Sequence, residues 1–385
     1  MGLLHAMNQM ESIDLRCHLV DDTTRIIIFM LLVLYVQKYS KRCEKAQINR
    51  IAIFLGKTKM EQYKNKYWDE NRDVKITVLT PTYNRKDTLL RTIRSIENQV
   101  FSDWEYIIVN DGSTDSTDKV VEQFMQTTKH PVLYIKKENG GVHTARNLGF
   151  KNARGELLIN LDSDDELVPE ALKVFWDTWK KIPHIDKAKY REVVAQCKDE
   201  SGKRVGYPFP KNINQLPWDK ARKICYESGE EHVACFVANV MKRNLFPEPE
   251  GVTFMTENIL WRKLDQTYCA YYINDMLRIY HQEGNDHLSS GLSAGHKKTI
   301  QNCKNALWES TQFLNDWEIY QDGGSYAKEL LRYCIMNHIL RQDATQQKFR
   351  KGCALKGIKN KCLFYLMWFP SIPAAKLYQK KKMKR

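Results

Sequence analysis

The sequence lacks the spacing patterns of several common nucleotide and metal sites. Its ten cysteines include no Cys-x-x-Cys pair, which excludes the usual zinc-ligand spacing. No Gly-x-Gly-x-x-Gly follows an expected strand and no Gly-x-x-x-x-Gly-Lys-Ser/Thr occurs, so dinucleotide-binding and P-loop sites are excluded on motif grounds. Without a convincing secretion signal, we expect the thiols to be reduced and buried.

Long apolar runs are also missing. Residues 26–36 are continuously apolar, but a bilayer crossing needs about 20 such residues. We therefore do not expect a processive synthase embedded by many membrane spans. Asp21 and Asp22 precede the run and no small-residue cleavage site follows it, so we expect no signal peptide. The run remains open to two interpretations, a buried helix or an interfacial anchor, and basic residues at 38–45 would keep the following domain cytoplasmic.

Acidic residues are absent from the last part of the sequence. Residues 350–385 hold eleven Lys and Arg but no Asp or Glu, so most of the net charge of +14 lies there. A nucleic-acid enzyme usually carries its basic surface on the folded body, and we expect no nucleic-acid partner. The apolar cluster at 362–369 beside these basic residues favours docking on an anionic membrane surface. The alternative is a core-packing helix with a solubilising tail.

From residue 74 onward, strand and helix patterns alternate. Four short apolar segments are expected to be strands: residues 75–79, 106–109, 132–135 and 157–161. The first intervening helix is expected to begin at an N-cap, Asp87, and to bury Leu89, Leu90, Ile93 and Ile96. Such alternation predicts an α/β fold whose central sheet is mostly parallel and flanked by helices.

An acidic cluster follows the last of these strands. Carboxylates crowded at the end of a buried strand repel one another unless a cation or donor groups lie among them. Asp162 and Asp164 can converge on one hard divalent ion and leave positions open for phosphate oxygens. A solvated turn or helix N-cap before Pro169 is the alternative.

Polar residues also follow the other strands. Thr80 and Tyr83 come after the first strand, and Asp111 comes after the second. Ligands in parallel sheets bind beyond the carboxyl ends of the strands, so these residues are expected to line one crevice with the acidic cluster. The crevice would then contain an aromatic ring, an isolated acid, the cation Arg146 and a carboxylate pair. These groups suit a ligand with a nucleobase and a diphosphate, together with a divalent ion.

Four segments in this order resemble the inverting family 2 glycosyltransferases, which have the GT-A nucleotide-sugar fold: ITVLTPTYNR, YIIVNDGSTDST, ENGGVHTARNLG and GELLINLDSDD. The resemblance covers about residues 74–172 and continues more loosely to about residue 290. It implies a divalent cation, Mn²⁺ or Mg²⁺, and a UDP-sugar donor. The implied setting is bacterial cell-surface polysaccharide synthesis.

The resemblance also implies residue roles. Thr80 and Tyr83 would border the nucleobase, and Asp111 would accept a hydrogen bond from the uracil ring N–H. Arg146 would help to hold the diphosphate. Asp162 and Asp164 would form the DxD element, in which one carboxylate faces the ribose or diphosphate and the other ligates the metal.

An inverting transfer also needs a base to take the proton of the acceptor hydroxyl. Residues 246–261 resemble the acceptor-side segment of the family, in which an acidic residue, often in a Glu-Asp pair, opens a helix. Here the pair is Glu257-Asn258, so we assign the base to Glu257. Asp165 is the alternative base, and a helix N-terminal acid favoured by the dipole is the structural alternative for Glu257.

Together these features predict four regions: a helical, potentially membrane-associated extension (1–72), a nucleotide-sugar region (73–180), an acceptor region (181–296) and a helical C-terminal extension with a basic docking tail (297–385). The expected protein is a cytoplasmic glycosyltransferase, peripheral on the inner face of the cell membrane, that acts on a glycan or lipid-linked saccharide. A non-catalytic nucleotide-sugar or glycan-binding subunit is the alternative, because Asn258 replaces the second acid.

Overall fold

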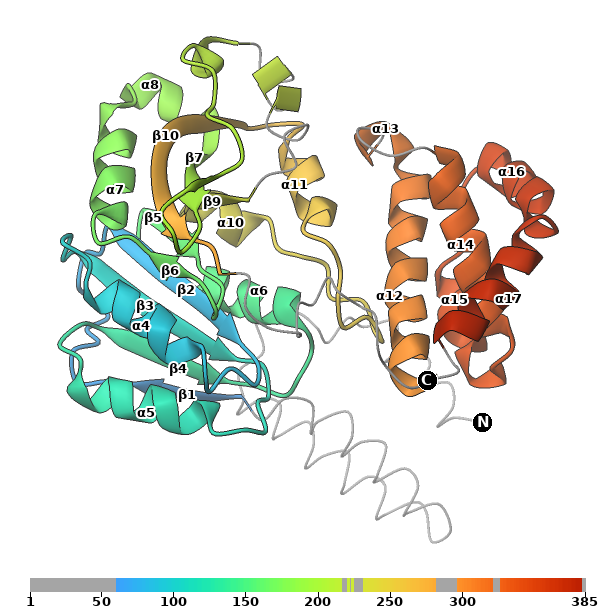
Figure 1. Ribbon diagram of the computed structural model, residues 1–385, viewed down its shortest axis with the longest axis horizontal. Helices are drawn as coiled ribbons and strands as arrows, with labels where there is room; N and C mark the ends of the chain where they lie inside the picture. Colours follow the sequence, from blue (N-terminus) through green and yellow to red (C-terminus); the bar gives the residue numbers. More distant parts are fainter. Residues whose placement is uncertain are drawn as a thin grey trace, which may run out of the picture. The chain divides into compact units, whose positions relative to one another are not determined.

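The computed structural model describes residues 60–216, 220–221, 223–224, 231–281, 296–320 and 326–382. They belong to one compact unit, Met60–Arg385 (Figure 1). The apolar run at 26–36 lies outside the described residues. The described residues contain a mixed sheet with helices on both faces, followed by a region made only of helices.

Within the described residues, the sheet has ten strands, nine of them on one path. Their order is β1 (Glu61–Lys64), β4 (Val132–Lys136), β3 (Trp104–Asn110), β2 (Ile76–Thr82), β5 (Leu157–Asn160), β9 (His232–Val237), β7 (Tyr190–Lys198), β10 (Cys269–Ile279) and β6 (Glu166–Leu167). The short β8 (Arg204–Val205) pairs with β7. The four central strands β4, β3, β2 and β5 are parallel, whereas β1, β9 and β6 pair antiparallel with their neighbours.

The two faces of the sheet have separate apolar cores because side chains alternate along each strand. One face packs against α4 (Leu89–Glu97), α5 (Thr117–Thr127) and α7 (Ala171–Lys181). The other face packs against α6 (Val142–Asn152), α10 (Ala238–Arg243) and α11 (Asn258–Leu264). On β2, for example, Val78 belongs to the first core and Leu79 to the second.

These observations confirm the predicted fold class and the four predicted strands. Two local predictions were wrong. The first helix has Thr88 at its N-cap in place of Asp87, and the Thr88 side chain makes no capping hydrogen bond. Leu90 is exposed, because it lies outside the arc on which Leu89, Ile93 and Ile96 face the sheet. Strand β1 was not predicted, and it places the start of the sheet inside the range assigned to the N-terminal extension.

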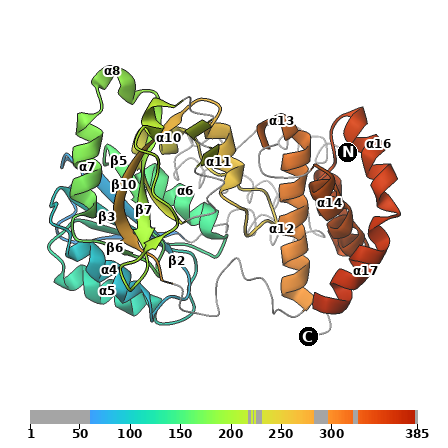
Figure 2. The ribbon, with the colours of Figure 1, turned by 45° about the horizontal axis from the view of Figure 1, so that its top comes forward.

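The C-terminal region is a group of helices with its own apolar core. It contains α12 (His296–Asn315), α13 (Trp317–Tyr320), α14 (Tyr326–Arg341), the short η3 (Ala344–Gln346), α15 (Gln347–Gly352), α16 (Ile358–Trp368) and α17 (Ser371–Lys382). Figure 2 labels α12, α13, α14, α16 and α17. No helix within the described residues combines the length and apolar character needed to cross a membrane.

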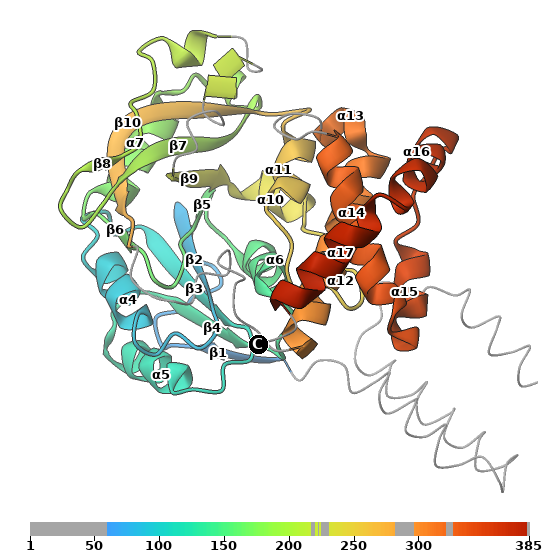
Figure 3. The ribbon, with the colours of Figure 1, turned by 45° about the vertical axis from the view of Figure 1, so that its right-hand side comes forward.

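Helix α12 contacts the segment that precedes α11, which lies beside it in Figure 3. Asn305 accepts a hydrogen bond from the Thr253 backbone N–H (3.0 Å), and Glu309 accepts one from the Thr256 backbone N–H (2.8 Å). Glu309 in turn pairs with Arg332 of α14 (2.8 Å). The C-terminal helices therefore fix the backbone immediately before Glu257.

Candidate functional site

Asp111 lies at the end of β3 and holds the loop that leads into α6. Its carboxylate is buried and accepts hydrogen bonds from the backbone N–H groups of Gly140 (2.9 Å) and Gly141 (2.8 Å). Lys137 forms an ion pair with the same carboxylate. A buried charge needs such partners to offset the loss of water. Asp111 thus shapes the Gly-Gly loop; its predicted contact with a uracil ring stays a prediction.

Gly141 joins this loop to the segment that carries Glu257. Its backbone has φ 97° and ψ 153°, a conformation that is essentially restricted to glycine. A Cβ atom there would lie 1.9 Å from the carbonyl oxygen of Thr253. The absence of a side chain is therefore what allows the two backbones to meet.

The loop after β2 is tied to the loop after β3. Asn84 has a positive φ of 53°, and its side-chain oxygen accepts a hydrogen bond from the Thr114 N–H (2.8 Å). Tyr83 beside it is exposed, whereas Thr80 is fully buried and its hydroxyl accepts a hydrogen bond from Tyr106 (3.0 Å). Tyr83 is open to a ligand, but Thr80 shows no exposed surface, and both roles at the nucleobase stay predictions.

The two carboxylates of the predicted DxD element follow β5 and remain partly exposed. The side chains of Asp162 and Asp164 are 48% and 36% exposed. Each faces a cation: Asp162 pairs with Arg146 (3.2 Å), and Asp164 lies 3.8 Å from Arg85. Arg85 was not predicted, although it ends the YNR sequence that marks the first motif.

The donor set suits a metal that takes only part of its coordination shell from the protein. Among the described residues, no group of three or more His, Cys, Asp and Glu side chains is arranged to hold an ion. Mg²⁺ is commonly bound by one or two carboxylates, with waters and substrate phosphates completing the shell. Two accessible aspartates at Asp162 and Asp164 fit that mode.

Arg146 is the central cation of the site. It extends from α6, is 7% exposed, and pairs with both Asp162 and Glu257. Burial disfavours the charged guanidinium, but the two carboxylates outweigh this effect and raise the pKa of Arg146 above its ordinary value. The structure thus brings together three predicted site residues from distant parts of the sequence.

Glu257 immediately precedes α11. One carboxylate oxygen pairs with Arg146, and the other accepts a hydrogen bond from the indole N–H of Trp261 (3.1 Å). The side chain remains 45% exposed. Glu257 is therefore oriented by two partners and still accessible, as a base that receives a proton from a substrate must be.

Asp165, the alternative base, has a different environment. It is buried and pairs with Arg278 of β10 (3.2 Å). Burial raises its pKa to about 6, although Arg278 opposes the shift. Its carboxylate faces β10, so Glu257 is the better-placed of the two.

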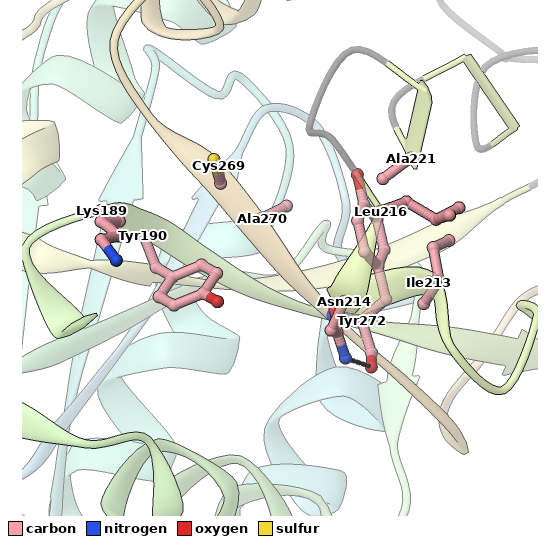
Figure 4. A pocket seen from close by; sticks show the side chains of 9 residues that line it. All are labelled: Lys189, Tyr190, Ile213, Asn214, Leu216, Ala221, Cys269, Ala270 and Tyr272. Carbon is pink, nitrogen blue, oxygen red and sulfur yellow. Dashed lines mark hydrogen bonds between the residues drawn. The ribbon is translucent and has the colours of Figure 1, made fainter.

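A separate cavity of about 160 Å³ lies at the starts of β7 and β10 (Figure 4). Tyr190, Asn214, Cys269 and Tyr272 are among its lining residues, and the Asn214 side chain is bonded to the backbone of Tyr272. None of the predicted site residues lines it.

Residues 77–248 match the family model described as "Glycosyl transferase family 2". They form a family 2 glycosyltransferase domain. The span contains Asp111, Arg146, Asp162 and Asp164, but Glu257 follows it.

Curated relatives of this domain are named glycosyltransferases. "Glycosyltransferase GlyA" of Streptococcus pneumoniae is 41% identical over 29% of this chain and 15% of its own length. The "GalNAc(5)-diNAcBac-PP-undecaprenol beta-1,3-glucosyltransferase" of Campylobacter jejuni is 28% identical over 57% of this chain and 68% of its own. The chain spans less than a third of the first two relatives, at 15% and 29% of their lengths.

Solved structures similar to the chain include S. aureus TarS 1–349 in complex with UDP-GlcNAc, with 17% identity, a TM-score of 0.44, and coverage of 78% of this chain and 80% of the other. Another is the mannosyltransferase PcManGT from Pyrobaculum calidifontis in complex with GDP-Man and Mn²⁺, with 15% identity, a TM-score of 0.44, and coverage of 80% and 88%.

Proposed function

We propose that the protein is a metal-dependent, inverting glycosyltransferase that moves a sugar from a UDP donor to a glycan or lipid-linked saccharide in bacterial cell-surface polysaccharide synthesis. The observation that carries the proposal is the contact of buried Arg146 with both Asp162 and Glu257. It joins the residue predicted to face the donor to the residue predicted to act on the acceptor. The name of the Campylobacter relative, a glucosyltransferase on an undecaprenol-linked glycan, supports this class of acceptor.

In this proposal Glu257 takes the proton of the acceptor hydroxyl as that oxygen bonds to the anomeric carbon and the bond to the diphosphate breaks. Before the donor binds, Trp261 and Arg146 orient the Glu257 carboxylate, and the Trp261 contact can persist when the donor diphosphate takes up Arg146. Arg146 and Arg85 supply positive charge to the diphosphate side. Asp162 and Asp164 would hold the cation, which would offset the charge of the departing diphosphate.

The proposal includes a location on the cytoplasmic face of the membrane. A lipid-linked acceptor would be reached there by an enzyme that docks without spanning the bilayer. The basic sequence after residue 350 supports this location.

The test measures UDP release and sugar transfer from a panel of UDP- and GDP-sugars, with and without Mn²⁺. We expect Asp164→Ala or chelation to lower transfer on the order of 100-fold or more. Glu257→Gln should lower it by about 10²–10⁴-fold, the usual contribution of a general base. Asp73→Asn, at an exposed carboxylate beside Lys75, is the matched control and should transfer normally.

Undiminished transfer by Glu257→Gln would show that the base is another residue. Activity unaffected by Asp164→Ala and by chelation would contradict the metal site. The alternative function, a non-catalytic binding subunit, draws its support from Asn258 in place of a second acid. It predicts that the unaltered protein binds UDP but transfers nothing across the donor and acceptor panel.

A further inference from the structure

Helix α16 exposes a row of apolar residues on one side. Ile358, Cys362, Tyr365, Leu366 and Phe369 are all exposed, and we call this row, which ends just beyond the helix, the α16 stripe. The intervals of three and four residues place them on one face of a helix. A continuous exposed apolar face on a folded domain marks a contact surface.

The opposite side of α16 is anchored in the C-terminal core. Leu363, Phe364 and Met367 pack against the buried residues of that core. The backbone carbonyl of Trp368 also lies 2.9 Å from Nε2 of His338, and the two rings are 3.6 Å apart. The stripe is therefore held outward by packing on the other face and is not a core face left uncovered by chance.

Lysines flank the stripe on α16, and the next helix also exposes lysines. Lys359 and Lys361 are exposed on α16 itself, and Lys376 and Lys380 are exposed on α17, which also exposes Leu377. No Asp or Glu occurs anywhere from residue 350 to 385. The occupant that this surface favours is thus both apolar and negatively charged.

We propose that the α16 stripe and its flanking lysines dock the protein onto an anionic lipid surface. Apolar side chains at the headgroup boundary combined with basic residues are the two interactions that hold interfacial helices. A second copy of this chain fits the surface less well, because an isologous contact would bring the same lysines together. The inference assigns residues to the membrane location proposed above, and it does not depend on the donor or on the chemical step.

The first test compares binding of the full chain to phosphatidylcholine vesicles with and without phosphatidylglycerol. Leu366→Ser/Phe369→Ser should lower partitioning by about tenfold or more. Lys359→Glu/Lys361→Glu should lower it on the anionic vesicles alone. Ile185→Ser is the matched control, because Ile185 on α8 (His184–Lys187) is 85% exposed, like Ile358 at 83%, and it should bind normally.

Cys362 allows a second test on the unaltered protein. Its thiol lies within the stripe, so anionic vesicles should slow its alkylation, read by peptide mass spectrometry. Cys269, partly exposed on β10, should react at the same rate with and without vesicles. This measurement does not depend on any variant folding correctly.

Unchanged vesicle binding by the Leu366→Ser/Phe369→Ser variant, with Cys362 equally reactive in both conditions, would overturn the inference. So would a dimer in solution that the same variant dissociates while vesicles leave Cys362 unprotected. Transfer to a water-soluble acceptor should be normal in the variant, whereas transfer to an acceptor in vesicles should fall. Loss of transfer to both acceptors would show that the substitutions impair the catalytic step itself, and would contradict a role of the stripe in docking alone.

Discussion

Gly141 is the position at which one added methyl group should separate the two halves of the site. The residue donates its N–H to Asp111 on the donor side and lies against the Thr253 carbonyl on the acceptor side. In Gly141→Ala, the new Cβ would meet that oxygen at 1.9 Å, where contacts below 3.0 Å essentially never occur. The obstacle is backbone and cannot turn away as a flexible side chain could.

Two costs add in this variant. Holding an alanine at φ 97° and ψ 153° costs about 1–3 kcal/mol. Moving the Thr253 backbone, which α12 also holds, costs about 1–3 kcal/mol more, as overpacking of a well-packed site does. We expect Gly141→Ala to lower the free energy of unfolding by about 2–6 kcal/mol. Because Glu257 lies four residues beyond Thr253, transfer should fall as well.

Urea denaturation of matched variants measures this difference. Gly202→Ala is the control for backbone strain, because Gly202 has φ 82° but no atom lies within 4 Å of the place that a Cβ would take. It should lose only about 1–2 kcal/mol. If Gly141→Ala and Gly202→Ala lost equal stability, the close approach to Thr253 would not be the cause and the reasoning would be refuted.

Three further predictions concern charge and burial. Arg146→Met should lower the free energy of unfolding by about 3 kcal/mol, measured by urea denaturation. This value is at the lower end of the usual cost of breaking a buried ion pair, because Glu257 is half-exposed. Unchanged stability would contradict the prediction. Burial disfavours ionised Asp118, but its hydrogen bonds and ion pair hold its pKa below the ordinary value, so this stabilisation is present above about pH 4 and lost as pH falls further. Asp118→Asn should flatten the acid limb of the stability curve, and an identical limb would contradict this. Cys362 should react with maleimide about 100-fold faster than Cys303, whose pKa burial raises to about 12; equal rates by mass spectrometry would contradict the burial.

The sheet could be predicted because its signal is local. The four central strands are short apolar segments bounded by polar turns, and each residue of β2 and β3 is buried. The boundaries of helices were less well predicted. Leu90 is as apolar as Leu89, and only the position of the sheet determines that it faces solvent. Strand β1 has the sequence EQYK, which contains no apolar run, and three of its four residues are exposed. Only its pairing with β4 makes it a strand.

The candidate site could be predicted where its residues follow strands, because topology brings strand ends together. The partners of those residues could not. Lys137 and Arg85 face Asp111 and Asp164 through loop geometry that spacing does not reveal. The contact of Arg146 with Glu257 depends on α12. This helix holds residues 253–256, just before Glu257, through Asn305 and Glu309.

The arrangement around Arg146 implies an order of binding. Its guanidinium is paired with Asp162 and Glu257. With the Asn160 amide oriented so that its oxygen faces the guanidinium, that oxygen accepts hydrogen bonds from Nε (3.1 Å) and Nη2 (3.3 Å). The five N–H donors of a guanidinium thus already serve four contacts here, so a donor diphosphate that binds Arg146 through two N–H groups must displace one of these partners. Asp162 and Glu257 are half-exposed and can turn toward solvent, whereas Asn160 belongs to β5.

Displacement of Glu257 would free its carboxylate for the acceptor hydroxyl only after the donor has bound. We therefore expect an acceptor analogue to bind measurably in calorimetry with UDP present and much more weakly without it. In Arg146→Met, which lacks the competing cation, the dependence on UDP should diminish. Equal acceptor affinity with and without UDP in the unaltered protein would mean that the Glu257 carboxylate receives the acceptor while it is still paired with Arg146, and that this pairing serves stability and not the order of binding.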